Sequence, residues 1–114
     1  MTDPLKAALE PYLLAVNGMK AEHVVALDVR KYTSLADVFI ICEGNSNRQV
    51  SAIGDYIVRT LKDQGTKPLS VEGETEGRWV LLDYGNVIIH VFYAPVRTFY
   101  DIDGLWADAR RIEL

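Results

Sequence analysis

The first hydrophobic pattern along the chain is helical. Apolar side chains between residues 4 and 20 recur every three or four positions, which is the spacing of one helix face. Asp3 is placed to cap this helix, and Pro4 suits its first turn. Pro11 lies inside the pattern and removes a backbone hydrogen-bond donor. The segment is therefore predicted to be either a kinked helix or two short helices.

Two short, continuously apolar segments follow, and both predict strands. Residues 23–29 read His-Val-Val-Ala-Leu-Asp-Val, and residues 37–42 read Asp-Val-Phe-Ile-Ile-Cys. Because apolar residues occupy successive positions, we expect each strand to be covered on both faces.

A second amphipathic helix is predicted after a turn at residues 44–46. Ser46 and Gln49 have the spacing of a Ser-x-x-Gln capping box, and Gly65 and Pro68 mark the end of the helix. Its apolar stripe consists of Val50, Ile53, Ile57 and Leu61. The order of strand, long helix and further strand is the one that a parallel crossover requires.

The second half of the chain predicts three strands and a helical tail. Residues 69–72 form a short strand, residues 79–83 and 87–93 form a hairpin, and residues 97–114 contain one or two short helices. The chain has no repeat, low-complexity segment or linker. Residues 1–114 are therefore predicted to be a single α/β (α+β) domain, with a mixed sheet of about five strands and flanking helices.

Composition restricts the class of protein further. The chain has 114 residues, of which 49% are hydrophobic and 25% charged, as expected for one folded domain. A formal net charge of −4 disfavours binding to nucleic-acid phosphates, DNA included, and favours a protein partner. Cys42 is the single cysteine, so an internal disulfide is excluded. With no apolar run of ~20 residues and no secretory-signal pattern, a cytoplasmic protein without a membrane anchor is expected.

The turn at Gly44-x-Ser46 is the most enzyme-like feature. It lies between a strand and a helix N-terminus, where free backbone amides can hold an anion. The same two residues would also be needed simply to make the turn and cap the helix, and glycine-rich nucleotide motifs are absent. The enzymatic alternative is a small nucleotidyltransferase that uses this turn, with Glu72 and Asp83 as metal ligands.

Two pairs of acidic residues have a spacing that metal sites use. They are Asp101-x-Asp103, before the C-terminal helix, and Glu74-x-Glu76, in a polar loop. Helix capping explains the first pair and solvation explains the second. We therefore predict no metal site, no cofactor and no small-molecule substrate.

Two chemically reactive residues lie in apolar strands. His90 is on the same side of its strand as Ile88 and Phe92, and no serine or cysteine is placed to use it as a base. Cys42 ends an apolar strand. Both are predicted to be structural, His90 as a core or sheet-surface residue and Cys42 as a small buried hydrophobe.

Aromatic and cationic residues indicate a binding surface. Strand alternation places Trp79, Leu81 and Asp83 on one face of the sheet. The segment Arg97-Thr98-Phe99-Tyr100 adds further residues of the types that dominate protein interfaces. If a helix does not cover this face, Trp79 and Leu81 form an apolar patch with an acidic rim. The alternative is that the aromatic residues belong to the core.

These motifs occur in an order and spacing that resemble the Iojap family, the ribosomal silencing factors RsfS, from about residue 20 to residue 107. The segments that carry the resemblance are Leu27-Asp28-Val29-Arg30, Ala36 to Cys42, Gly44-x-Ser46-x-Arg48-Gln49-Val50, Val71-Glu72-Gly73, Trp79 to Val87, His90-Val91-Phe92, Arg97-x-x-Tyr100 and Leu105-Trp106.

The resemblance implies a homodimer-forming domain with a nucleotidyltransferase-like fold and no enzymatic activity. It also implies that the protein binds the large ribosomal subunit through ribosomal protein L-fourteen. Bound there, it would block joining of the small subunit and repress translation when nutrients are scarce. Organellar relatives imply a role in maturation of the large subunit.

Residues for binding the ribosomal protein follow partly from the resemblance. Trp79 and Tyr100 match family positions that contact it. Leu81 and Arg97 are added because they lie next to these two, and the carboxylates are added as partners for basic groups. The predicted contact residues are Trp79, Tyr100, Leu81, Arg97, Glu72 and Asp83.

Overall fold

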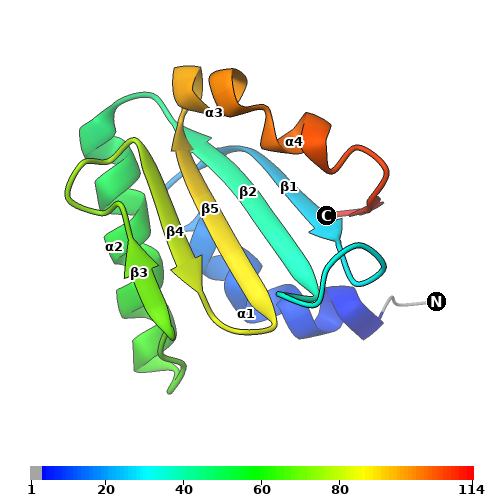
Figure 1. The fold of residues 1–114 in the computed structure, drawn as a ribbon. Coiled ribbons are helices and arrows are strands. Elements are labelled where there is room, and N and C mark those ends of the chain that lie inside the picture. The colour runs from blue at the N-terminus through cyan, green and yellow to red at the C-terminus, as the bar shows by residue number, and fades with distance from the viewer. Residues whose placement is uncertain (1–3) are drawn as a thin grey trace.

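The computed structural model describes residues 4–114, so the predicted cap Asp3 lies outside the described residues. Its elements, in chain order, are α1 (Pro4–Asn17), β1 (Glu22–Asp28), β2 (Val38–Gly44), α2 (Asn47–Asp63), β3 (Ser70–Glu72), β4 (Trp79–Asp83), β5 (Val87–Tyr93), α3 (Ala94–Tyr100), α4 (Ile102–Leu105) and β6 (Arg110–Ile112) (Figure 1). Among residues 4–114, no helix is long and apolar enough to span a membrane.

All the strands belong to one mixed sheet, in the order β3-β4-β5-β2-β1-β6. β2 and β5 run parallel, and every other neighbouring pair is antiparallel. The predicted crossover is present and joins β2 to β3 through α2. These two strands are not neighbours, because β5 and β4 lie between them in the sheet. The sheet has six strands instead of about five, because the three-residue β6 pairs with β1.

β6 was missed because its sequence has no strand pattern. Arg110-Arg111-Ile112 contains a single apolar residue, which is too short a signal for alternation. The segment is held in place by pairing with Ala26–Asp28 and by the ion pair between Arg110 and Asp28, at 3.3 Å. Tertiary contacts therefore decide this strand.

Helix α1 is continuous through Pro11, so the alternative of two short helices is wrong. Pro11 is exposed, and the carbonyl that loses its donor can bond to water instead. The buried residues of this helix are Leu9, Leu13, Ala15 and Val16.

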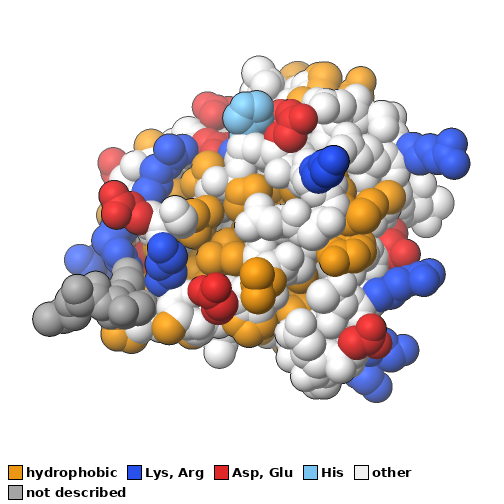
Figure 2. Space-filling model, turned by 180° about the vertical axis from the view of Figure 1, so that it is seen from behind, with side chains coloured by type: hydrophobic (Ala, Val, Ile, Leu, Met, Phe, Trp, Pro, Cys, Tyr) orange, Lys and Arg blue, Asp and Glu red, His pale blue; other side chains and the backbone are white. Residues whose placement is uncertain are grey.

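Helices α1 and α2 cover one face of the sheet (Figure 1). The stripe predicted for α2 is buried against β2, β4 and β5, and every residue of β2 except Glu43 is buried, as predicted for a strand covered on both faces. On its outer side this helical layer carries basic and acidic side chains spread among apolar ones (Figure 2). The helical layer thus shows no dominant charge of one sign.

The other face of the sheet is covered only in part. Val96 of α3, Ile102 of α4 and Trp106 pack on a second core around Phe39 and Phe92. In Figure 1, α3 and α4 lie along one end of the sheet and no helix crosses the face of β3 and β4. Trp79 and Leu81 of β4 consequently remain partly exposed.

The loop between β3 and β4 is set by a glycine. Gly73 has φ +79°, a conformation that residues with a side chain rarely adopt. A Cβ atom at this position would also collide with the backbone carbonyl oxygen of Trp79. Gly73 therefore permits the close approach of this loop to the start of β4.

Replacing Gly73 by alanine should cost at least about 2 kcal/mol of the free energy of unfolding, because left-handed strain and a backbone clash add together. Gly65→Ala is the matched control: its φ is +87°, but no atom lies within 4 Å of the new Cβ. It should cost only ~1 kcal/mol. Urea unfolding of both variants measures the difference, and equal losses would contradict the role of the clash.

Candidate functional site

Strand β4 presents the predicted alternation. Trp79, Leu81 and Asp83 are partly exposed, while Val80 and Leu82 are buried under α2. In the antiparallel register Trp79 lies opposite Phe92, and Leu81 lies opposite His90. The partly open face therefore has an apolar strand backed by aromatic rings.

Trp79 is the centre of an aromatic cluster formed by β4, β5 and α3. Its ring stacks on Phe92 with centroids 4.8 Å apart and contacts Tyr100 of α3 at 5.2 Å. Tyr100 is 50% exposed and its neighbour Phe99 is 81% exposed. We call Trp79, Leu81, Phe99 and Tyr100 the aromatic face. Its aromatic members are neither fully buried nor isolated, so the interpretation of them as core residues is not supported.

His90 lies beneath this surface and orients Trp79. It is 5% exposed, as predicted for a structural residue, and its Nδ1 accepts a hydrogen bond of 3.2 Å from the Trp79 indole N–H. That bond requires a neutral imidazole with its proton on Nε2. Burial lowers the pKa of His90 to about 4, so the neutral form is maintained at neutral pH.

The buried imidazole predicts a pH dependence of stability. Because the folded pKa is about 4 and the unfolded value is ~6.5, the unfolded chain takes up a proton first as pH falls. Between about pH 7.5 and pH 5, the wild type should lose roughly 2 kcal/mol more unfolding free energy than His90→Gln. Chemical unfolding at the two pH values measures this loss.

The second histidine of the chain supplies the control. The side chain of His23 is 71% exposed and its Nδ1 lies 3.4 Å from Glu43, on another part of the surface, so His23→Gln should retain the loss of stability that is assigned to His90. The same dependence in His90→Gln as in the wild type would contradict the assignment to His90.

Arg97 is used inside the fold. Its guanidinium donates to Glu43 at 3.0 Å, to both oxygens of Asp103 at 2.9 and 3.1 Å, and to the backbone carbonyl of His23 at 2.8 Å. Only 11% of the side chain is exposed. The hydrogen bonds from Arg97 lower the pKa of Asp103, which stays ionised. These contacts fix α3 on the sheet and thereby place Tyr100 beside Trp79.

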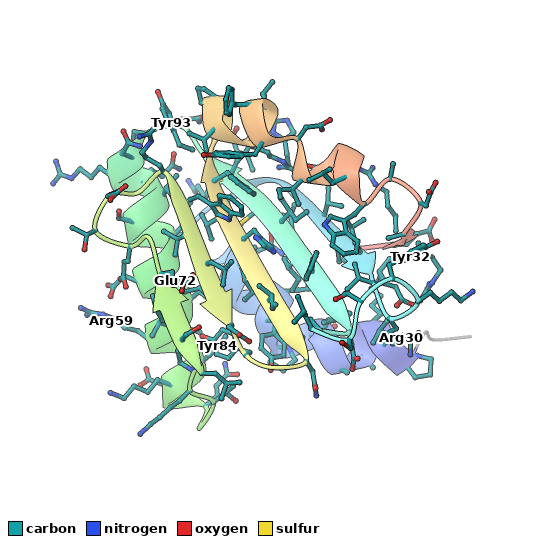
Figure 3. All side chains as sticks on the ribbon, in the orientation of Figure 1. Arg30, Tyr32, Arg59, Glu72, Tyr84 and Tyr93 are labelled. Carbon is teal, nitrogen blue, oxygen red and sulfur yellow. The ribbon has the colours of Figure 1, made fainter. Side chains whose placement is uncertain are left out.

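Glu72 and Asp83 lie near the aromatic face but in different settings. Glu72 is exposed on the edge strand β3, opposite Leu81 (Figure 3). Asp83 ends β4, and its carboxylate accepts a hydrogen bond of 2.8 Å from the Gly85 N–H. The two carboxylates give this side of the face an acidic rim.

The turn at Gly44-x-Ser46 serves as a helix cap, as its structural interpretation predicts. Ser46 Oγ accepts from the Gln49 N–H at 3.0 Å, and Gln49 Oε1 accepts from the Asn45 N–H at 2.6 Å. A Cβ on Gly44 would be within 3.3 Å of Val50 and Gln49. The N–H groups of Asn45 and Gln49 are therefore bonded within the turn instead of being available to a phosphate.

The acids of the enzymatic alternative lie away from this turn. Asp83 is at the same level of the sheet as Phe39, because both are in register with Ile88. Phe39 precedes Gly44 by five residues of β2, so Asp83 is about 17 Å from the turn along the strand direction. Glu72 is three strand spacings from β2, or about 14 Å. The fold thus separates the two carboxylates from the turn that they would have to serve.

The remaining candidates have structural partners. Asp101 caps α4 by accepting from the Gly104 N–H at 3.1 Å, and Asp103 binds Arg97, so helix capping and ion pairing explain this acidic pair. Cys42 is fully buried, as predicted, and burial raises the pKa of its thiol to about 12.

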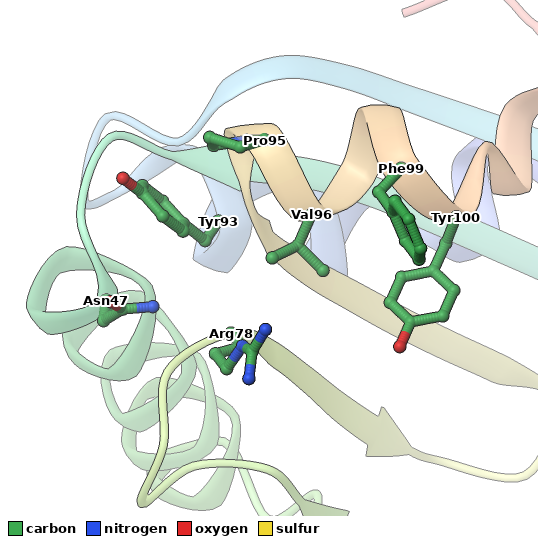
Figure 4. A pocket seen from close by; sticks show the side chains of 7 residues that line it. All are labelled: Asn47, Arg78, Tyr93, Pro95, Val96, Phe99 and Tyr100. Atoms are coloured by element: carbon green, nitrogen blue, oxygen red, sulfur yellow. The ribbon is translucent and has the colours of Figure 1, made fainter.

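Two features were not predicted. Glu22, His23 and Glu43 place possible ligand atoms within 4.8 Å of one another, although Arg97 already neutralises Glu43. The second feature is a hollow of about 490 Å³ next to the aromatic face (Figure 4). Its lining comes from α2, the residue before β4, the end of β5, and α3, so no local sequence signal could indicate it.

The fold and the site define a small α/β protein in which two helices cover one face of a mixed sheet and an aromatic cluster reaches solvent on the other. Comparison with known families identifies it further. The chain belongs to the RsfS family, described as ribosomal silencing factor during starvation, whose profile matches residues 2–114. The resemblance noted in the sequence is confirmed.

Individual relatives agree with this assignment. The ribosomal silencing factor RsfS of Halalkalibacterium halodurans is 43% identical over 100 residues, covering 88% of this chain and 86% of the relative. A crystal structure of a Chromobacterium violaceum protein has a TM-score of 0.84 and 35% identity, covering 93% of this chain and 88% of that one. A mouse relative, 27% identical over 75% of this chain and 39% of its own length, is named mitochondrial assembly of ribosomal large subunit protein 1.

Proposed function

We propose that this protein is a non-catalytic translation repressor of the cytoplasm. It binds the large ribosomal subunit through ribosomal protein L-fourteen and blocks joining of the small subunit when nutrients are limiting. Membership of the silencing-factor family supports the ribosomal role, and the name of the mouse relative supports the large subunit and a further role in its assembly. The observation that carries the proposal is the contact between Trp79 and Tyr100 on the partly open face.

The aromatic face has the properties of a protein-binding centre. Trp79 and Tyr100 are large, and the packing of Trp79 on Phe92 and His90 holds it rigid, so little conformational entropy is lost on binding. Leu81 extends the apolar area along β4. In this proposal Trp79, Tyr100 and Leu81 contact the ribosomal protein directly.

Charged residues have separate roles around this centre. Glu72 and Asp83 form ion pairs with basic groups of L-fourteen, which sets orientation and speeds association. Arg97 acts as a positioning residue for Tyr100, since its donors already bind Glu43 and Asp103. The net charge of −4 suits a basic protein and disfavours exposed ribosomal RNA.

Repression by this route needs no catalysis. The domain measures 38 × 33 × 23 Å, and only one face is used for binding. In this proposal the rest of the body occupies space beside L-fourteen that the small subunit needs. Occupancy alone then shifts the joining equilibrium by mass action.

Tyr100→Ala and Trp79→Ala should each weaken binding to purified large subunits by ~2 kcal/mol or more, about thirtyfold, because both side chains are anchors of the interface. Co-sedimentation measures the affinity, and ribosome fractionation measures the loss of free large subunits. Tyr100→Ala is the cleaner change, since this residue is half exposed and its removal leaves the core intact.

Leu14→Ala provides a control on the opposite face. Leu14 is 64% exposed on α1, so its removal should change neither binding nor the level of joined ribosomes. Binding by folded Tyr100→Ala and Trp79→Ala at wild-type strength would refute the assignment of this face.

We also expect the free protein to be a homodimer that uses the same aromatic face. One apolar surface cannot be buried twice, so dimerisation and ribosome binding should compete. Light scattering should detect a dimer that dissociates to a one-to-one complex as L-fourteen is added. Tyr100→Ala should weaken the dimer as well, and a stable two-to-two complex would contradict the shared face.

A further inference from the structure

The hollow beside the aromatic face combines aromatic walls with one positive charge. Tyr93, Val96, Phe99 and Tyr100 supply its apolar side from the end of β5 and from α3, and Arg78 lies opposite Val96 (Figure 4). Its volume of about 490 Å³ is within the range of side-chain and ligand pockets. The site therefore offers an apolar surface and a guanidinium within one opening.

Arg78 has no ion pair or side-chain hydrogen bond with any other residue in the 4–114 range. Its backbone, by contrast, is firmly held: the Arg78 carbonyl accepts from the Tyr93 N–H at 2.9 Å, and the preceding Gly77 carbonyl accepts from the Asn47 side chain at 3.1 Å. The guanidinium is thus an available donor on a fixed backbone.

This hollow is continuous with the aromatic face. A second depression of about 200 Å³, bounded by Gly73, Glu76 and Trp79, shares Arg78, Val96 and Tyr100 with it. The combined groove runs from Tyr93 past Tyr100 to Trp79. A partner seated on Trp79 and Tyr100 therefore also reaches Arg78.

We infer that this groove receives a segment of the ribosomal protein in which an apolar side chain is adjacent to a carboxylate. The apolar side chain packs on Tyr93, Val96 and Phe99. The carboxylate pairs with Arg78. The inference rests on the proposed function, because it assumes that the partner is seated on the aromatic face. Arg is suited to this role because its planar guanidinium binds a carboxylate through two hydrogen bonds.

The charges of the whole face favour a protein carboxylate over a nucleic-acid phosphate. Arg78 immediately precedes β4, Asp83 ends the strand five residues later, or about 17 Å along it, and Glu72 lies on the adjoining strand. Glu72 lies opposite Leu81, midway along β4, and Glu76 borders the same depression as Arg78. Carboxylates therefore occur along the length of the face, and Arg78 adds a cation at the end away from Asp83. A ribosomal protein can match that pattern with basic groups and one acidic group, whereas a phosphate backbone is repelled over most of its length. The opposite charges thereby also fix the direction in which the partner docks.

The test compares Arg78→Met with the wild type in binding to purified L-fourteen and to purified large subunits, at low and high salt. Methionine keeps much of the apolar stem and removes the charge. Arg78→Met should bind both probes about tenfold more weakly and lose less affinity as salt rises, and Arg78→Glu should bind more weakly still. Phe99→Ala, which removes an 81% exposed ring from the groove, should also weaken binding to both.

Arg59→Met is the matched control. Arg59 projects from the outer side of α2, with its side chain 77% exposed and paired with Asp55 (Figure 3). Its replacement should leave binding and the salt dependence unchanged. Thermal unfolding of each variant shows whether the fold is intact.

Each other outcome has a definite meaning. If Arg78→Met binds with wild-type affinity and Tyr100→Ala binds weakly, the groove does not receive the partner, and the proposed function is unaffected. If Arg78→Met binds whole subunits more weakly but binds isolated L-fourteen normally, the anion that pairs with Arg78 belongs to ribosomal RNA. That result would overturn the inference of a protein carboxylate. Wild-type binding by both Arg78→Met and Tyr100→Ala would refute the proposed function as well.

Discussion

Hydrogen bonds from the Arg97 guanidinium to Glu43, Asp103 and the His23 carbonyl join α3 to α4, β1 and β2. The aromatic face depends on this junction. Helix α3 is only seven residues long and has no buried residue, so apolar packing alone holds it weakly. A largely buried cation with two carboxylate partners is costly to break, because either partner left alone is an uncompensated charge. The ion pairs therefore keep Tyr100 in place beside Trp79.

Unequal covering of the two sheet faces produces the surface that the proposed function uses. Two long helices bury one face, while the short C-terminal elements bury only the end of the other face near β1 and β2. On the uncovered part, Trp79 is supported by Phe92 and by the neutral imidazole of His90. Rigid apolar rings at a partly exposed position favour protein binding, since their orientation is already set before the partner arrives.

The same arrangement explains why the residues of the enzymatic alternative do not come together in the fold. The turn after β2 follows a strand and begins a helix, but the N–H groups of Asn45 and Gln49 already bond to the side chains of Gln49 and Ser46. Glu72 and Asp83 lie on strands that the crossover carries to the far side of β5. The sheet order, and not the presence of the residues, determines which groups can act together.

The sequence by itself determined the helices, the first five strands along the chain and the alternation of β4, because hydrophobic periodicity is a local property of neighbouring residues. It also indicated Trp79 and Tyr100 through family motifs. Only the tertiary structure decided that β6 pairs with β1, that Arg97 faces inward and that Arg78 joins Tyr93 and Phe99 in one groove. Those contacts join segments far apart in the chain, and their energies depend on burial and distance, which no local pattern records.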